Sequence, residues 1–394
     1  MRYLWKLLFV LLFSFLTSSA IYGQSVEQLY KAGLQSLQSG AYYAAEAYFK
    51  QALTKDDSRV EIWNNYAEAA RLNNNYTTAI QAYEKVIQLD KTKAFPLSHF
   101  WLGSLLIYVQ RYNEAIRQLE NFQYDYRKED YYAQKARQLI ESCAWALEHQ
   151  TADNLNINPM PDDINSFYSE INPFFLDSNK FCFSTTRPLK GINLSTYMVL
   201  AGDEQPFLPG ITASVASHLA NGHYSYSRVY GSELFFTVCQ SSGAETKCKI
   251  YSSVNKNGVW QKAAPLPPAI NLPGFTATHP HTYNDAQGGQ WLFFVSDRPG
   301  GKGRLDIWYS RRISEKDWEY PVNAGNSINS VDDEVTPFVD HQDQVIYFSS
   351  AWHYGYGGFD IFYSDIVSLN EARFGEPKNL GLPVNSSANE VYFA

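Results

Sequence analysis

Three glutamates recur at one position of a repeated motif, and carboxylates that lie close together perform the acid and base chemistry of many hydrolases. The motif reads N-S-x-x-x-E and occupies residues 165–170, 329–334 and 385–390, with a degenerate copy at Asn271. If the repeats surround a channel, glutamates at its mouth would provide a hydrolytic site. The repetition favours a structural role instead, because catalytic groups need different roles at one site, whereas identical repeats need identical turn contacts.

The other candidates for chemistry also have structural interpretations. Asp306 and Asp360 follow glycine-rich turns, where an aspartate that accepts backbone N–H bonds is the favoured interpretation. His279 and His281 share one strand face at i, i+2 spacing, but the sequence shows no further metal ligands near them. The sequence also contains no catalytic-serine elbow, no phosphate loop and no spaced cysteine cluster. We therefore expect no catalytic residue, no metal and no cofactor, and predict that the protein is not an enzyme.

The elements that position these residues repeat after residue 160. Asn165 and Asn385 lie 220 positions apart (385 − 165), which is four periods averaging 55 residues. Each period contains the motif, an aromatic strand, a glycine-rich turn and two further short strands. The aromatic strands all end in phenylalanine, at residues 181–183, 234–236, 292–294 and 346–348. Four strands per period predict β-propeller blades, so residues 164–394 are expected to be all-β.

Glycines precede the strands at residues 305–310 and 359–364, which lie 54 positions apart. Because glycine adopts positive φ without steric cost, these glycines are expected to form the hairpin between strands. They are Gly300, Gly301 and Gly303 in one period and Gly355, Gly357 and Gly358 in the next. The last motif copy, at residues 385–390, predicts the first strand of a fifth blade after about four others, and a propeller that is incomplete at its C-terminus.

Residues 25–148 contain a different repeat, whose positions are displaced by 34 and then by 36 residues. Ala45, Ala79 and Ala115 occupy one position of this repeat, and small and aromatic residues recur at fixed offsets around them. The pattern resembles the tetratricopeptide repeat, in which two antiparallel helices cross closely at a small residue. It predicts an α-solenoid of three repeats with a capping helix over residues 131–147, followed by a linker over residues 149–163.

The first 24 residues have the pattern of a secretory signal peptide. Arg2 and Lys6 precede an apolar run over residues 7–16, and small and polar residues follow it. No later segment reaches the ~18 apolar residues that a spanning helix requires, so we expect no transmembrane segment in the mature chain. The sequence therefore predicts an exported, periplasmic protein.

The overall composition excludes some classes of partner. Hydrophobic residues make up 45% of the chain and aromatic residues 16%, which is enough for packed cores. The 32 basic and 40 acidic residues give a formal net charge of −8, and removal of Arg2 and Lys6 would make it −10 (30 − 40). Since nucleic-acid binding depends on a basic surface, nucleic acid is not expected as a partner.

Two of the four cysteines have the spacing of a hairpin disulfide. Cys239 and Cys248 flank a turn over residues 240–247 and would face each other across it. The alternative is that both remain buried thiols. Cys143 and Cys182 lie in different predicted domains and are expected to be single buried residues.

Binding surfaces are the expected functional features, since solenoids and propellers expose broad faces to partners. Six residues at inner-groove offsets of the first helices are expected to contact a peptide or partner segment: Tyr30, Asn64, Glu68, Arg71, Phe100 and Tyr108. The alternative for Tyr30 and Phe100 is packing against the next helix. In the propeller, Trp352 and Tyr354 lie in a glycine-rich loop, where their rings would stack on sugar rings.

The wording S-D-R-P-G-G-x-G-x-x-D-I-W at residues 296–308 resembles the TolB-like propeller repeats of bacterial envelope proteins, which are related to WD-type propellers. In envelope proteins of Bacteroidota, including type IX secretion components, tetratricopeptide repeats precede such a propeller and an OmpA-like peptidoglycan-binding domain often follows. The resemblance implies an outer-membrane-associated protein whose partners are envelope proteins. It also implies contact with peptidoglycan through a C-terminal domain that is missing from this sequence.

Together, the two interaction folds and the lack of a catalytic pattern predict a non-enzymatic periplasmic scaffold of an envelope assembly. Type IX secretion and attachment of the outer membrane to peptidoglycan are the two settings that the resemblance implies. A propeller that binds glycans or muropeptides is the alternative. A hydrolase accessory that uses Glu170 or Glu334 is a third hypothesis.

Overall fold

The computed structural model describes residues 24–177, 180–190, 194–213, 217–242 and 245–393. The chain divides into two compact units, Met1–Ala144 and Trp145–Ala394, which are described separately below. The predicted signal peptide lies outside the described residues except for Gln24. Among the helices in the described ranges, none combines the length and the apolar character that crossing a bilayer requires.

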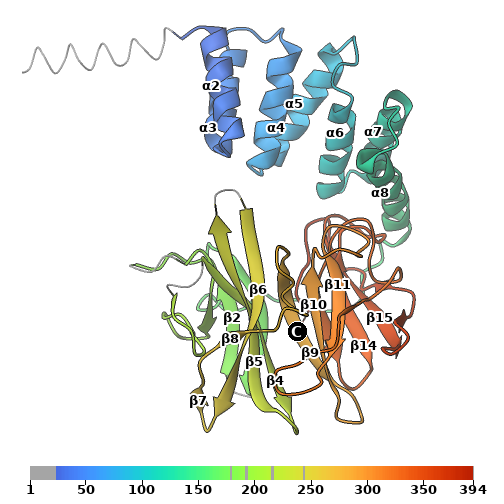
Figure 1. Cartoon of the computed structure of the whole chain (residues 1–394). Coiled ribbons are helices and arrows are strands. Elements are labelled where there is room, and N and C mark those ends of the chain that lie inside the picture. The colour runs from blue at the N-terminus through green and yellow to red at the C-terminus, as the bar shows by residue number, and fades with distance from the viewer. Residues whose placement is uncertain (1–23, 178–179, 191–193, 214–216, 243–244, 394) are drawn as a thin grey trace, which may run out of the picture. The chain divides into compact units, whose positions relative to one another are not determined.

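The first unit is an array of helices that pack side by side in sequence order (Figure 1). The helices of the described chain are α2 (Val26–Gln38), α3 (Tyr42–Leu53), α4 (Val60–Leu72), α5 (Tyr76–Leu89), α6 (Leu97–Tyr108), α7 (Tyr112–Asp125) and α8 (Tyr131–Glu148). The pairs α2–α3, α4–α5 and α6–α7 are the three predicted repeats, and α8 follows them. The helical solenoid is therefore confirmed.

Each helix pair is held by one small residue that lies against one large residue. A Cβ atom added to Gly33 would lie 2.5 Å from the Phe49 ring, and one added to Gly103 would lie 2.7 Å from Cγ of Leu119. Ala67 has the equivalent position in the second pair and is fully buried. Because any larger residue would separate the two helices, the repeat spacing in the sequence follows directly from these crossings.

The second unit consists of four antiparallel sheets whose strands pair mostly in chain order. The first sheet contains β1 (Glu170–Asp177), β2 (Lys180–Thr185) and β3 (Tyr197–Leu200). The second contains β4 (His218–Ser227), β5 (Gly231–Ser242), β6 (Glu245–Lys256), β7 (Val259–Trp260) and β8 (Ala264–Pro265). The third contains β9 (Ala277–Asn284), β10 (Gln290–Ser296), β11 (Asp306–Arg311) and β12 (Val322–Asn323). The fourth contains β13 (Glu334–Asp340), β14 (Val345–Ser350), β15 (Asp360–Ser368), β16 (Arg373–Phe374) and β17 (Lys378–Asn379).

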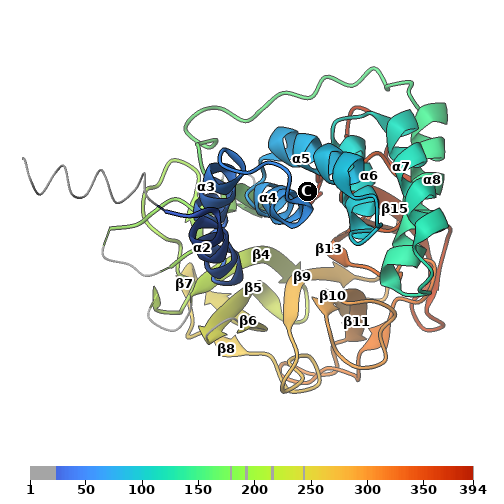
Figure 2. The same ribbon diagram turned by 90° about the horizontal axis from the view of Figure 1, so that it is seen from above.

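These sheets are the blades of a four-bladed propeller, which confirms the predicted fold class. The innermost strands β1, β4, β9 and β13 contact one another in that order, and Figure 2 shows β4, β9 and β13 around the middle of the ring. The four predicted aromatic strands lie in β2, β5, β10 and β14. Residues 385–393, which include the last copy of the motif and were predicted to begin a fifth blade, form no strand in the described chain.

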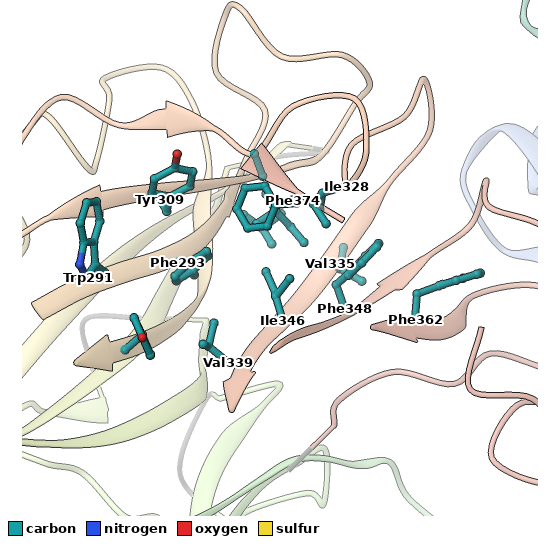
Figure 3. Close-up of a cluster of buried hydrophobic side chains, with 14 residues drawn as sticks. Trp291, Phe293, Tyr309, Ile328, Val335, Val339, Ile346, Phe348, Phe362 and Phe374 are labelled. Atoms are coloured by element: carbon teal, nitrogen blue, oxygen red, sulfur yellow. The ribbon is translucent and has the colours of Figure 1, made fainter. Parts of the chain in front are cut away.

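The blades are joined by apolar side chains that alternate along each strand. On β10, Phe293 packs with Tyr309 and Phe348 in the cluster between the third and fourth blades (Figure 3). Its neighbour Phe294 faces the other way and packs with Phe235 of the second blade. Since consecutive side chains of a strand point to opposite faces, an uninterrupted apolar strand is buried on both sides.

The glycines before β11 and β15 were predicted to have positive φ, which is correct for one of them. Of the six, Gly300 has positive φ, at 88°, and the other five do not. A Cβ atom on Gly303 would lie 2.1 Å from the carbonyl oxygen of Asp332, and one on Gly357 would lie 2.2 Å from that of Ser387. Gly303 and Gly357 are therefore required by the close approach of the next motif copy rather than by turn conformation.

Candidate functional site

The repeated glutamates hold turns in the three complete copies of the motif. Glu334 is fully buried and accepts hydrogen bonds from the backbone N–H of Ser330 at 2.7 Å and the Ser350 hydroxyl at 2.8 Å. Glu170 and Glu390 accept the equivalent backbone bonds, at 3.1 and 3.0 Å. Burial raises the pKa of Glu334 to about 7, although its hydrogen bonds act in the opposite direction. This geometry is that of a capped turn.

The asparagine that begins each motif joins one blade to the next. Asn329 accepts a hydrogen bond from the N–H of Ile307 and donates one to its C=O, both at 2.8 Å. The same two bonds join Asn271 to Ile250 and Asn385 to Ile361. Asn165 differs, because its amide donates to the C=O of Met160 instead. The side-chain amide therefore takes the place of a β-bridge between consecutive repeats.

Asp306 and Asp360 occupy equivalent turns and are bonded by backbone and amide groups. Asp306 accepts from the N–H groups of Lys302 and Gly303 and from Asn323, the last at 2.9 Å. Asp360 accepts from the N–H of Tyr356 at 2.6 Å, and burial raises its pKa to about 7. These contacts are those of turn-capping aspartates.

A groove of about 420 Å³ in the helical unit is the strongest candidate for partner binding. Two of the predicted contact residues, Asn64 and Glu68, lie on α4 and line it. The remaining lining residues come from α5, α6, α8 and the loops beside them: Tyr83, Ala94, Phe95, Pro96, Leu97, Trp101, Tyr126, Lys128 and Tyr132. Aromatic rings thus surround an amide and a carboxylate in a concave surface that is large enough for a few side chains.

The charges beside this groove are paired and held flat against an aromatic ring. The Arg71 guanidinium makes two hydrogen bonds to the Glu68 carboxylate, at 2.6 and 3.0 Å. The same guanidinium lies 3.8 Å from the centre of the Trp101 ring. The hydroxyl of Tyr83 also donates to Glu68, at 3.0 Å. Arg71 therefore joins three lining residues into one rigid group with no net charge.

Asn64 and Lys128 provide the polar contacts at the edge of this group. The side-chain oxygen of Asn64 accepts a hydrogen bond from the Ser98 hydroxyl at 3.3 Å, so its amide nitrogen is the atom that offers donors to a ligand. Lys128 is exposed, and its ammonium lies 6.0 Å from the centre of the Tyr126 ring. The groove consequently offers a hydrogen-bond donor, a cation at the rim and flat apolar walls.

The other predicted residues of the helical unit lie outside this groove. Phe100 is 3% exposed and packs against Phe122 and Tyr132, which supports the packing alternative for it. Tyr30 accepts a hydrogen bond from Asn65 at 3.0 Å and lies beneath an arginine. Tyr108 packs edge-on against a neighbouring tyrosine at 4.4 Å. None of the three lines the groove.

Trp101, Tyr126, Lys128 and Tyr132 line the groove, although the sequence alone does not predict them there. Trp101 directly follows Phe100, so the inner face of α6 is turned by one residue from the expected position. Pro96 precedes this helix, and the two extra residues of the third repeat lie nearby. The sequence feature that could have predicted Trp101 at the groove is therefore this insertion, since it changes which residues of α6 lie on its inner face.

Trp352 and Tyr354 come together on the propeller. They line a shallow depression of about 380 Å³ with Lys302, Asn326 and Val331 among its other residues. Tyr354 is 46% exposed. The structure thus places the two predicted aromatic residues where both can contact one ligand.

The cysteines are distributed as follows. Cys239 on β5 lies opposite Cys248 on β6, and their sulfur atoms are 2.07 Å apart. Cys143 and Cys182 are both buried thiols. Burial raises the pKa of Cys143 to about 12, so this thiol stays protonated at neutral pH.

His279 and His281 do not form a metal site in the described part of the chain. There, no group of three or more histidine, cysteine or acidic side chains has an arrangement that would hold a metal ion. His281 instead lies beside His223, with the ring centres 4.1 Å apart. Burial lowers the pKa of His223 to about 3 and that of His279 to about 4. These histidines are therefore neutral at physiological pH.

Comparison with known proteins identifies one repeat of the helical unit. The tetratricopeptide repeat family matches residues 60–93, which include α4 and α5. Among solved structures, the Yersinia enterocolitica secretion chaperone SycD with a peptide of the translocator YopD has 19% identity and a TM-score of 0.28, covering 31% of this chain and 93% of its own. The TPR2B domain of yeast Sti1 in complex with pHsp70 has 16% identity and a TM-score of 0.28, with coverages of 30% and 96%. A search of curated proteins gave no match.

Proposed function

We propose that this protein is a non-enzymatic scaffold that captures an extended segment of a partner protein in the groove of its helical unit. The observation that carries the proposal is the group formed by Glu68, Arg71 and Trp101 at the groove. It presents a flat surface that is already ordered, so a ligand that binds there does not have to immobilise these side chains. An extended peptide suits this surface, because its backbone carbonyls can accept from Asn64 while its side chains lie on the rings.

The chemistry of the groove indicates which side chains a partner segment would carry. Trp101, Tyr126 and Tyr132 provide aromatic surface, which favours proline and other compact apolar side chains. Because Glu68 is already paired with Arg71, the wall of the groove has little attraction for a further cation. Lys128 at the rim would instead favour an acidic side chain beside the apolar one.

We place this scaffold in the periplasm, in association with the outer membrane, with envelope proteins as its partners. Arg2, Lys6 and the apolar run over residues 7–16 support export. The motif at residues 296–308 supports an envelope assembly, for which type IX secretion and attachment to peptidoglycan are the two settings considered. Fractionation of cells that express the protein with an epitope tag tests the location. Recovery in the cytoplasm with residues 1–24 still attached would refute it.

Site-specific photo-crosslinking tests capture in the groove. A photoreactive side chain in place of Tyr132 should crosslink to one partner in intact cells, and mass spectrometry should map the adduct to an extended segment. The same side chain in place of Tyr43, which is 79% exposed, is the control and should not give that adduct.

A synthetic peptide of the mapped segment should then bind the purified protein. Replacing Trp101 with alanine should weaken binding by about tenfold or more, because the ring supplies both apolar contact and the support of Arg71. Tyr43→Ala should leave the affinity unchanged. Equal binding to wild type and to Trp101→Ala would exclude the groove as the capture site.

A second candidate function is glycan binding by the propeller, which the convergence of Trp352 and Tyr354 favours. Aromatic side chains stack on the apolar faces of sugars, and Asn326 beside them offers hydrogen bonds. A pull-down on purified peptidoglycan with wild type and Trp352→Ala tests this function. Equal retention of the two proteins would exclude it.

A further inference from the structure

A cavity of about 240 Å³ lies where the innermost segments of the propeller meet. It is lined by residues of β1, β4, β9 and β13 and by Tyr392 and Phe393 of the C-terminal segment. Phe175, which also lines it, is 59% exposed, so the cavity reaches the surface. Its volume is about eight times the ~30 Å³ that one water molecule occupies in the liquid, so one bound water does not fill it.

Each of the four blades and the C-terminal segment contributes one residue with positive φ to this cavity. These residues are Asn172, Asn221, His279, Thr336 and Tyr392, with φ between 50° and 66°. The pairing of β1, β4 and β13 shifts register next to these residues, as in a β-bulge. None of the five is glycine, although glycine adopts this conformation at the lowest cost. Each of these five positions therefore has a side chain in a backbone conformation that glycine would adopt at lower cost.

The lining of the cavity is uncharged. No aspartate, glutamate, lysine or arginine is among the described residues that line it. His223, His279 and His281 are present, but burial lowers the pKa of each of them below the physiological range. An ionic ligand would therefore find no counter-charge in the cavity, and a neutral ligand is favoured.

The hydrogen bonds around Tyr392 determine which nitrogen of His279 carries the proton. The amide nitrogen of Asn221 donates to Thr278 at 3.1 Å, so its oxygen faces the Tyr392 hydroxyl and accepts from it at 2.7 Å. Since that hydroxyl has donated its hydrogen, it accepts from Nε2–H of His279, at 3.2 Å. A neutral histidine that is protonated on Nε2 has a bare acceptor at Nδ1.

Two acceptor atoms of residues that line the cavity lack partners. Nδ1 of His279 and the side-chain oxygen of Asn172 are buried, and neither has a hydrogen-bond partner within the described chain. Both residues line the cavity. A buried acceptor without a donor is costly, so a molecule that donates to both atoms would be stabilised there.

The aromatic walls of the cavity indicate that the ligand also has apolar surface. Phe174, Tyr224, Phe338 and Phe393 provide aromatic surface beside the two acceptors. We propose that the cavity binds a small neutral polyhydroxy ligand, a single sugar ring or a cyclic polyol, whose hydroxyls donate to Asn172 and His279. Such a ligand presents several donors together with C–H groups that pack on aromatic rings. This site is separate from the groove of the helical unit and from Trp352.

The test uses the full mature chain and a panel of neutral probes: glucose, N-acetylglucosamine, myo-inositol and glycerol. Ligand-observed NMR should show saturable binding of at least one ring compound and its displacement by a second one. Absence of saturable binding for the whole panel would show that water alone occupies the cavity, and the proposal would fail.

Asn172→Gly gives the sharpest variant, because glycine suits the φ of 52° at this position while the acceptor is removed. Binding should weaken by about tenfold or more with no fall in melting temperature. Asn257→Gly is the matched control, since Asn257 has φ 53° and does not line the cavity. Trp352→Ala should bind as wild type does, which separates this site from a surface glycan site. Unchanged binding by Asn172→Gly would refute the proposed site.

Discussion

The side-chain amide of Asn329 pairs with both backbone polar groups of Ile307, at 2.8 Å each, so one blade closes the edge of the blade before it. Asn329 is 2% exposed, and loss of its amide would leave the buried N–H of Ile307 without a partner, while the C=O of Ile307 would keep the bond that it accepts from the N–H of Ala324 at 3.0 Å. We therefore expect Asn329→Ala to lower the free energy of unfolding by about 1–3 kcal/mol. Denaturant unfolding followed by tryptophan fluorescence measures this change.

Asn165→Ala is the control for that experiment. Asn165 begins the first copy of the motif, but it bonds locally to Met160 at a partly exposed position. Its replacement should cost less than about 1 kcal/mol. Equal losses for the two variants would contradict the role assigned to the link between blades.

Gly303→Ala should destabilise the propeller because the new Cβ atom would lie 2.1 Å from the carbonyl oxygen of Asp332. The contact is with backbone, so the strand and the motif must move apart, at about 1–3 kcal/mol. At Gly375 an added Cβ atom would lie 3.5 Å from its nearest neighbours, and φ is not positive. Gly375→Ala should therefore be neutral in the same thermal unfolding measurement. A neutral Gly303→Ala would show that the close approach relaxes without cost.

Glu334 predicts a definite pH dependence. Its pKa is about 7 in the folded protein, above the usual value near 4.5, so folding takes up a proton between these two pH values. The contribution of the protonated carboxyl to stability is complete below pH ~4.5 and is lost as the pH rises through ~7. The stability of Glu334→Gln relative to wild type should therefore rise with pH in this window, by up to about 1.4 kcal/mol per pH unit.

Unfolding of Glu334→Gln and of wild type at a series of pH values measures the difference in their free energies of unfolding. The buried histidines are the same in both proteins, so their effect cancels in this difference. A constant difference would mean that Glu334 stays ionised in the folded protein. The same variant tests the hydrolase hypothesis, because a catalytic glutamate would lose turnover without this change in stability.

Arg71→Lys should lower the melting temperature of the helical unit, since a lysine cannot make both bonds to Glu68 while it lies flat on Trp101. Circular dichroism at the helical band measures the change. Arg111 provides the matched control, because it makes the same two bonds to Glu114 three residues later but is 42% exposed. Arg111→Lys should leave the melting temperature unchanged. Equal effects of the two substitutions would show that the position of Arg71 over the Trp101 ring does not stabilise the helical unit.

Alkylation and mass spectrometry test the state of the cysteines. Protein purified from the periplasm should contain a peptide that links Cys239 to Cys248, and Cys143 and Cys182 should react after denaturation and not before it. Protein from a reducing cytoplasm should have four reactive thiols after denaturation. In the folded periplasmic protein, reactive thiols at Cys239 and Cys248 would contradict the pairing, and reactive thiols at Cys143 and Cys182 would contradict the burial.

The features that could be predicted from the sequence are those that recur locally. Ala45, Ala79 and Ala115 identify the helix crossings because each crossing needs a small residue, whatever the rest of the chain does. The period of the phenylalanine strands identifies the blades for the same reason. A contact that every repeat must make leaves a spaced pattern of residues.

The features that could not be predicted depend on residues from distant repeats. The close approach of Gly303 to Asp332 concerns the space between a glycine-rich turn and the motif copy that follows it, which neither segment shows by itself. The cavity at the centre of the propeller combines Asn172 with Tyr392, which are far apart in the chain. Similarly, the two-residue insertion before α6 changes which side chain faces the groove. The repeat spacing predicts Phe100 at the groove, but Phe100 is buried and the next residue, Trp101, lines the groove.

The asparagine link also has a consequence for synthesis. β11 ends at Arg311, but the residue that closes it, Asn329, is made 18 positions later (329 − 311). In a nascent blade the N–H of Ile307 therefore has no partner until the beginning of the following repeat has left the ribosome. Translation that pauses inside this interval would prolong exposure of an open strand edge, where other chains can pair. A pause after the asparagine of the next motif copy would leave this edge bonded, whereas a pause directly after the last strand of the blade would not.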